Sequence, residues 1–286
     1  MGITAGLFAF AALRAVPLDA SAAPTNSGRP AGSPAALAEQ MQSAIQDASP
    51  GAEVGIEVVD TTTGAVIADL NADQQFYTAS VVKLLIALDE LKSQGWKPDS
   101  DTAGQLDRML SASDDDIADR LWGCNGGNAI VSRMAELIGL NGTRPPSDPS
   151  EWGETLTTPN DVVAIYHYIT ATVPEPASDV ILNALRNTSR IAADGTDQNF
   201  GIPDGLPGTT TAIKQGWMTL DTSTTMNTTG LVGSDPGQPL RYTVVVLTSQ
   251  PAGVSWTAGG AALTAGVGVL RSVIGSHTML AAVESR

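Results

Sequence analysis

The stretch "FYTASVVKLLIAL", residues 76–88, is typical of a strand end that leads into a buried helix. Ser80 and Lys83 lie three residues apart, at the point where this helix should begin. The chain has only four lysines among its 286 residues, so a lysine inside an apolar helix is unusual here. Such a lysine must bury its charge, find a partner or give up its proton. Either Ser80 is a simple helix cap and Lys83 reaches the surface, or the two side chains form a functional pair.

The elements around this stretch follow from hydrophobic spacing and turn residues. Residues 34–47 have helical spacing, and "GIEVVD" and "AVIADL" flank the turn "TTTG", which predicts a β-hairpin over 55–70. Residues 143–159 contain four prolines and no apolar period, so they are expected to be a loop. The remaining predictions are helices within 104–140 that break at "GCNGG" and "GLNG", helices at 161–170 and 175–188, strands at 211–217, 224–233 and 241–249, and a last helix at 259–275.

This order indicates an α+β protein, because strands occur near both ends and helices are inserted between them. We expect an antiparallel sheet flanked by helices, together with an all-helical subdomain. The sheet subdomain is expected to consist of residues 34–79 and 187–286, and the helical subdomain of residues 80–186. Residues 1–33 are interpreted as a signal peptide followed by a linker rich in Pro, Ser and Gly.

The signal-peptide interpretation depends on the apolar run "ITAGLFAFAAL", residues 3–13, which is too short to cross a bilayer comfortably. Ala20-Ser21-Ala22 then matches an A-x-A cleavage signal. No Lys or Arg precedes the apolar run, which is atypical for a leader, and no cysteine follows it, which argues against a lipid anchor. We therefore expect a protein that is secreted or exposed on the outside of the cell envelope.

Composition excludes several functions. A net charge of -15 argues against nucleic acid or an anionic membrane as a partner. Cys124 is the single cysteine, and His167 and His277 are the two histidines, so neither a disulfide framework nor a cysteine or histidine metal cluster is expected. With two histidines in the sequence, a Ser-His-Asp triad is also not expected. We expect a monomer with no cofactor and a small molecule as its partner.

Three motifs carry the functional prediction. Ser80 and Lys83 form S-x-x-K, a spacing that is common by chance. "MLSASDDDIADRLW", residues 109–122, contains Ser113-Asp114-Asp115, and "TAIKQGW" contains Lys214-Gln215-Gly216. In this order they match S-x-x-K, S-D-N and K-T-G, the first motif fully and the other two in part. From about residue 35 to its end, the chain resembles the serine β-lactamase and penicillin-binding-protein superfamily, and most of all the class A β-lactamases.

The resemblance implies a role for each motif residue. Ser80 would be the acylated nucleophile and Lys83 its general base. Ser113 would relay a proton to the leaving group, although a helix cap is the simpler interpretation of this serine alone. Lys214 would lie beside Ser113 and attract a substrate carboxylate, although an edge-strand charge is equally common. The backbone N–H groups of Ser80 and Trp217 would form the oxyanion hole.

The substrate-binding residues implied by the family are Asp115, Gln215, Gly216 and Trp217. We expect that position 216 requires glycine because substrate backbone must pass close to this strand. Asp115 replaces the family's asparagine, and its carboxylate near Lys83 would favour the ammonium form over a free-amine base. Gln215 replaces a threonine whose hydroxyl usually helps to bind the substrate carboxylate, and its amide would have to donate from a different position.

The expected loop at 143–159 departs most from the class A pattern. It is short and lacks the E-x-x-L-N motif, whose glutamate activates the water that frees the enzyme. Glu151 and Glu154 are the nearest candidates for that base, although both could simply face solvent. Without such a base, acylated Ser80 would stay blocked, as in a penicillin target or a slow hydrolase.

Three functions therefore remain open. The first is an exported serine hydrolase that forms an acyl-enzyme with a β-lactam or a related amide or ester. The second is a catalytically weak or inactive penicillin-binding-like protein that binds a cell-wall peptide or another partner. The third is a D-Ala-D-Ala peptidase, which shares the acyl-enzyme but uses a different acceptor.

Overall fold

The fold is taken from a computed structural model, which describes residues 33–274. The expected signal peptide and His277 lie outside the described residues. A five-stranded antiparallel sheet forms the centre, in the order β2-β1-β7-β6-β5. The strands are β1 (Glu53–Asp60), β2 (Ala65–Leu70), β5 (Thr211–Thr219), β6 (Ser223–Val232) and β7 (Tyr242–Pro251).

Strands from the two ends of the chain meet in the middle of this sheet. β1 pairs with β2 in the expected hairpin, and on its other side with β7, where Ile56 lies opposite Val246. β6 then joins β7 to β5, which is an edge strand. The expected α+β class and the antiparallel sheet built from both ends are confirmed.

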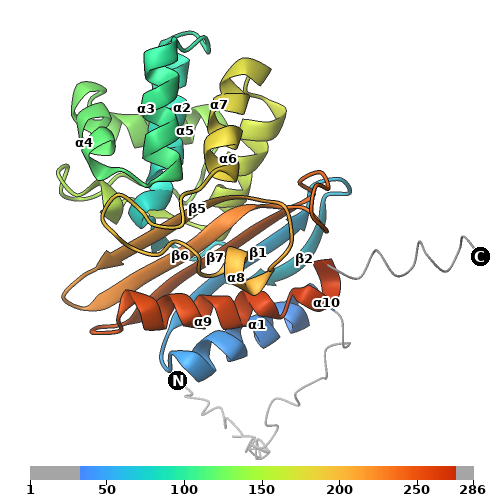
Figure 1. Cartoon of the computed structure of the whole chain (residues 1–286). Coiled ribbons are helices and arrows are strands. Elements are labelled where there is room, and N and C mark those ends of the chain that lie inside the picture. The colour runs from blue at the N-terminus through green and yellow to red at the C-terminus, as the bar shows by residue number, and fades with distance from the viewer. Residues whose placement is uncertain (1–32, 275–286) are drawn as a thin grey trace, which may run out of the picture.

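Two helical layers cover the sheet (Figure 1). One face carries α1 (Pro34–Ala48), α9 (Trp256–Gly268) and the short helices α8 (Ile202–Gly205) and α10 (Arg271–Ile274). The other face carries the helical layer α2 (Lys83–Ser93), α3 (Ser100–Ser111), α4 (Asp115–Cys124), α5 (Asn128–Ile138), α6 (Pro159–Ala171) and α7 (Glu175–Arg186). The domain boundaries expected at 79/80 and 186/187 stay a prediction.

The alternation of side chains along β7 explains why the sheet needs both layers. Val245 and Leu247 belong to the hydrophobic cluster under the helical layer, whereas Val244 and Val246 belong to the cluster under α1 and α9. Successive side chains of a strand point to opposite faces, so the continuous apolar run 244–247 must be covered on both sides.

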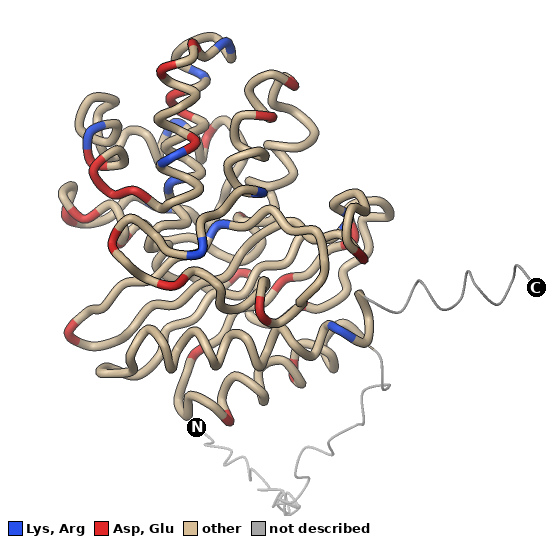
Figure 2. Tube along the Cα trace, in the orientation of Figure 1, with Lys and Arg blue, Asp and Glu red and all other residues tan. Residues whose placement is uncertain are grey.

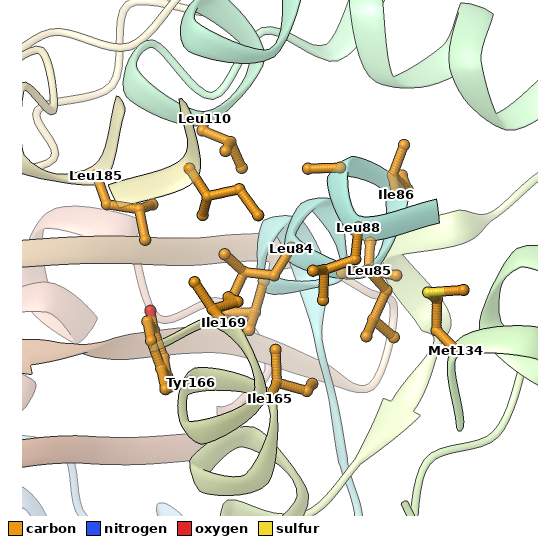
Figure 3. Packing of buried hydrophobic residues seen from close by; sticks show 14 of the residues in the cluster. Leu84, Leu85, Ile86, Leu88, Leu110, Met134, Ile165, Tyr166, Ile169 and Leu185 are labelled. Atoms are coloured by element: carbon orange, nitrogen blue, oxygen red, sulfur yellow. The ribbon is translucent and has the colours of Figure 1, made fainter. Parts of the chain in front are cut away.

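Helix α2 forms the centre of the helical layer. Leu84, Leu85, Ile86 and Leu88 are at most 1% exposed, and Figure 3 shows other buried side chains of the cluster around them. Burial of one such side chain stabilises a fold by about 1.5–3 kcal/mol. The helix is therefore held firmly on all sides, which places Lys83 at its first residue in a rigid setting.

The last part of the chain is apolar enough to resemble a membrane span, because Trp256–Ile274 has a mean hydropathy of 1.3 over 19 residues. In the fold it is a core segment. A Cβ on Gly266 would come within 2.5 Å of Ile45 on α1, and one on Gly259 within 2.8 Å of Met226 on β6. Glycines at these positions therefore let the helix lie close to α1 and to the sheet.

The segment at 143–159 differs from the loop that was expected. It contains a short 3-10 helix, η2 (Trp152–Glu154), and the strand β4 (Leu156–Thr157), which pairs with β3 (Phe76–Tyr77). The sequence predicted a loop because the segment contains four prolines and no apolar period. The strand pairing could not be predicted from local sequence, because it is long-range and only two residues long. The pairing holds this segment next to the 3-10 helix η1 (Ala79–Val82), which carries Ser80.

Candidate active site

Ser80 and Lys83 form the pair that their spacing predicts. Ser80 lies in η1, Lys83 is the first residue of α2, and the Lys83 Nζ donates a hydrogen bond to the Ser80 Oγ at 2.7 Å. Ser80 is 5% exposed and Lys83 is fully buried. The alternative of a capping serine with a lysine that reaches the surface is therefore excluded.

Ser113 connects this pair to Lys214. Its Oγ lies 3.3 Å from the Lys83 Nζ and accepts a hydrogen bond from the Lys214 Nζ at 2.9 Å. Lys214 is fully buried on β5, so its interpretation as an exposed edge-strand charge is wrong. The four side chains come from three segments that are far apart in the sequence, and they form one continuous chain of contacts.

The backbone at Ser113 shows that this serine is not a helix cap. Asp114 is the N-cap of α4, and its carboxylate accepts a hydrogen bond from the backbone N–H of Ile117. Ser113 has a φ of 54°, a left-handed conformation that is unfavourable for residues other than glycine. Such strain persists only where the surrounding structure enforces it, and here it aims the hydroxyl at both lysines.

Burial sets the charge state of the two lysines. Desolvation lowers the pKa of Lys83 below its usual value, and the carboxylate of Asp115, whose Oδ1 lies 2.5 Å from the Lys83 Nζ, opposes this effect. The pKa of Lys214 lies well below its usual value, first because of burial and then because of the positive charge on Lys83. Lys83 is thus both buried and partnered, and its pKa still falls on balance.

Asp115→Asn should move the pH profile of Ser80 acylation. The Asp115 carboxylate raises the pKa of Lys83, so its removal lowers that pKa further. If Lys83 must be neutral to accept a proton, the acidic limb of the acylation rate then shifts to lower pH. Asp116→Asn is the matched control, because Asp116 lies in the same first helical turn and is exposed. A limb that stays in place or moves to higher pH in Asp115→Asn would contradict this assignment.

Gly216 allows β5 to approach η1 closely. A Cβ at this position would lie 2.7 Å from the backbone oxygen of Thr78 and 3.2 Å from Val81. The close contact is with the chain's own backbone beside Ser80, whereas the sequence predicted that it would be with the substrate. The two backbone N–H groups of the expected oxyanion hole, those of Ser80 and Trp217, stay a prediction.

Gln215 does not reach the cleft, and this corrects its expected role in substrate binding. Lys214 and Gly216 face the helical layer, so Gln215 between them faces the other side of the strand. Its side chain is fully buried, and its Nε2 donates to the backbone oxygens of Gln198 at 3.1 Å and Phe200 at 2.6 Å. It therefore anchors the segment before α8 to β5. Strand alternation could have predicted this from the sequence.

A cleft of about 440 Å³ opens at Ser80, a volume suited to a small molecule. Asp115, Glu151 and Trp217 line it, whereas Glu154 does not. A larger hollow of about 620 Å³ lies on the other side of Trp256 and contains none of the four contact residues described above. No group of three His, Cys, Asp or Glu residues within 33–274 is placed to hold a metal ion.

Trp152 is the main residue that the sequence analysis missed. The Lys83 Nζ lies over its ring, 4.7 Å from the ring centre, and its Nε1 donates to Asp119 at 2.7 Å. The indole thus covers Lys83. In the sequence, Trp152 lies between Glu151 and Glu154, the two residues that were considered as deacylation bases. An aromatic residue inside a polar, proline-rich loop was the available signal.

Comparisons with known proteins agree with this fold. Residues 36–94 match a model of the β-lactamase enzyme family. The chain is 36% identical over 220 residues to proteins named putative lipoprotein LppW in Mycobacterium tuberculosis and Mycobacterium bovis, which covers 74% of this chain and 68% of each relative. The chain belongs to the serine β-lactamase and penicillin-binding-protein superfamily.

Solved structures with this β-lactamase-like fold are more distant in sequence. A class A β-lactamase from Mycobacterium abscessus matches with a TM-score of 0.67 and 20% identity, over 84% of this chain and 99% of that one. A mutant of PBP-A, solved as an acyl-enzyme with penicillin G, matches with a TM-score of 0.66 and 19% identity, over 84% and 96%. At these identities the likeness shows the fold.

Proposed function

We propose that this β-lactamase-like chain is an exported serine hydrolase that forms an acyl-enzyme at Ser80 with a β-lactam or a related amide or ester and releases it slowly. One observation carries the proposal: two hydroxyls and two amines from η1 and α2, the α3–α4 turn and β5 meet in one buried chain of contacts. Such a chain can move a proton from a nucleophile to a leaving group.

Each contact supports a proton step in the acylation. Neutral Lys83 accepts the Ser80 proton over 2.7 Å while the Ser80 Oγ bonds to the substrate carbonyl carbon. Ser113 gives its proton to the leaving nitrogen or oxygen and regains one from Lys83 over 3.3 Å. Lys214 stays beside the Ser113 Oγ and stabilises negative charge on it. The net result is an ester at Ser80 and a protonated leaving group.

Slow release is supported by the surroundings of Lys83. The Trp152 ring covers the ammonium group, and Glu151, the one candidate base that lines the cleft, is exposed. The PBP-A relative that was solved as an acyl-enzyme with penicillin G illustrates such a state in another protein of this fold.

Intact-protein mass spectrometry tests the proposal. Wild-type protein is incubated with a penicillin, a carbapenem and a neutral activated thioester, and Ser80→Ala is the control. We expect a covalent adduct of the acyl mass on wild type, no adduct on Ser80→Ala, and decay of the adduct over minutes to hours. A folded wild-type protein that forms no adduct with any of these reagents contradicts the proposal.

A binding protein without turnover is the second candidate, and the ion pair between Lys83 and Asp115 at 2.5 Å favours it. That pair opposes loss of the Lys83 proton, and a charged Lys83 cannot accept another. In this case the cleft would bind a cell-wall peptide or another partner reversibly. A D-Ala-D-Ala peptidase would instead form the adduct and transfer it to an amine acceptor.

The proposed place of action is the cell envelope. The relatives in the two mycobacteria are named putative lipoproteins, which is said of those proteins. For this chain, cell fractionation followed by detection of the full-length protein tests export. Recovery in the cytoplasmic fraction alone would contradict it.

Trp152→Glu should shorten the life of the acyl-enzyme by at least about tenfold, because a positioned general base contributes about 10²–10⁴-fold in rate. The substitution puts a carboxylate where the indole now covers Lys83 and opens the site to water. Trp152→Gln is the matched control, since it opens the same space without a base. Decay of the adduct is followed by mass spectrometry after removal of free reagent. Equal lifetimes in the Glu and Gln variants would show that this position cannot supply the base.

A further inference from the structure

We infer that the Ser80 cleft selects acyl donors that carry a positive charge, such as an ammonium or guanidinium group, and disfavours donors with a free carboxylate. This inference rests on the proposed acyl-enzyme function and names the substrate class of the same site. It departs from the expectation that Lys214 attracts a substrate carboxylate.

The walls of the cleft carry one sign of charge. Asp115, Asp119, Glu151 and Asp194 line it, and all four are exposed to solvent. No Lys, Arg or His of the described part of the chain is among its lining residues. A charged group that enters the cleft therefore meets four carboxylates first, and a concave wall of one sign concentrates ligands of the opposite sign.

The two buried lysines offset only part of this charge, because Lys83 is paired with Asp115 alone among the four carboxylates. The Lys214 Nζ is occupied by the Ser113 Oγ and by the backbone oxygen of Gln215, and the Lys83 Nζ is occupied by Asp115 and its serine partners. Both side chains lie behind the cleft surface, fully buried.

The carboxylates reach close to the reacting group. Asp115 contacts the Lys83 Nζ at 2.5 Å, and Asp115 and Asp194 line the hollow at Ser113, whose Oγ accepts a hydrogen bond from Lys214. A substrate carboxylate that approached Lys214 would therefore come near both acids. Like charges at such a distance repel, and the repulsion is stronger in a partly enclosed cleft than in bulk water.

Aromatic walls complete a surface suited to cations. Trp152, Trp217 and Trp256 line the cleft, and the rings of Trp217 and Trp256 lie 6.4 Å apart at 60°. The Trp217 Nε1 donates to Asp194 at 2.9 Å, as the Trp152 Nε1 does to Asp119. Each indole is thereby fixed next to a carboxylate, and the combination of ring faces with carboxylates is how proteins bind ammonium and guanidinium groups.

The neighbouring hollow extends the same charge. It is lined by Ser113, Asp115 and Asp194, and it adds Asp114 and Asp116. Figure 2 shows this acidic run at the start of α4. Arg108, the one basic residue in the lining, is paired with Asp114 at 2.5 Å. A substrate that spans both hollows therefore meets more carboxylates than basic groups.

A matched series of thioesters tests the inference. The compounds share the leaving thiol and the acyl chain length, and they differ at the chain end, which carries a trimethylammonium, a tert-butyl or a carboxylate group. The second-order rate constant of Ser80 acylation is measured at low salt and again in 0.5 M NaCl. We expect the ammonium compound to react at least about tenfold faster than the carboxylate, and salt to reduce the ratio.

Variants assign the effect to the cleft. Asp119→Asn combined with Glu151→Gln should lower the ammonium-to-carboxylate ratio by at least about threefold. Asp47→Asn, which removes one negative charge on exposed α1 across the sheet, should leave the ratio unchanged. A wild-type ratio of one or less, or a ratio that falls equally in Asp47→Asn, overturns the inference.

The two proposals fail in different ways. If the neutral and carboxylate thioesters acylate Ser80 and the ammonium compound has no advantage, the inference about charge is overturned and the acyl-enzyme stands. A neutral fluorophosphonate, which bonds its phosphorus to the Ser80 Oγ with loss of fluoride, is a second probe of the nucleophile. If neither the thioesters nor the fluorophosphonate modify Ser80, the acyl-enzyme proposal and the inference about charge are both overturned.

Discussion

Lys83→Met should lower the rate constant of Ser80 acylation by about 10³-fold, within the range by which a positioned general base accelerates a reaction. Lys83 is fully buried 2.7 Å from the Ser80 Oγ, and no other amine is in direct contact with that hydroxyl among the interactions of the described residues. Methionine fills a similar volume without an amine, so α2 should keep its packing. The rate is measured by stopped-flow or by timed mass spectrometry of the adduct.

Two further variants show whether Lys83 acts as a base or only as a positive charge. Lys83→Arg keeps the positive charge, but arginine cannot give up its proton in a protein, so it should be as slow as methionine if Lys83 is the base. Lys92→Met, on an exposed turn of the same helix, should acylate at the wild-type rate. Acylation of Lys83→Met within about tenfold of wild type would remove Lys83 from the proposed mechanism.

Gly216→Ala should lower the acylation rate by about 10²-fold, because a displacement of about 1 Å at a reacting centre costs about that much. The new Cβ would lie 2.7 Å from the backbone oxygen of Thr78, so β5 and η1 must move apart. Overpacking of this kind destabilises a fold by about 1–3 kcal/mol. Acylation kinetics and denaturant unfolding measure the two effects separately.

Gly104→Ala is the matched control. It lies in α3 with nothing within 4 Å of a new Cβ, and its φ is not in the left-handed range. Alanine there should stabilise the protein by about 0.5–1 kcal/mol and leave acylation unchanged. A Gly216→Ala protein that acylates Ser80 at the wild-type rate would show that the approach of β5 to η1 is not needed for the reaction.

Local patterns were enough to predict most of the fold. The hairpin over 55–70 was predicted from two strand-like runs around a turn with glycine, and the structure has β1 and β2 there. The helix after Ser80 was predicted from its apolar residues and the glycine at its end. These features depend on residues that are close in sequence, where side-chain periodicity and turn chemistry act directly.

Long-range contacts account for what was missed. The β3–β4 pair joins Phe76 to Thr157, and no local pattern predicts a pairing of two residues over that distance. The cap of α4 is Asp114, one residue from the serine that was considered, and Ser113 instead contacts two lysines that are distant in sequence. The contact of Trp152 with Lys83 was not predicted, because the loop has no periodicity from which the direction of its side chains could be inferred.

The order of the motifs, the class of fold and the identity of the four polar residues at the cleft can all be read from the chain, because they depend on residue types and on spacing along it. The direction in which the pKa of Lys83 shifts, the partners of the Gln215 amide and the acidic, aromatic wall around Ser80 cannot. They depend on which segments lie side by side in the fold. Burial and neighbouring charges act through space, where they alter a pKa and select a ligand. That is why the same sequence that indicated a carboxylate-binding site folds into a cleft lined by carboxylates.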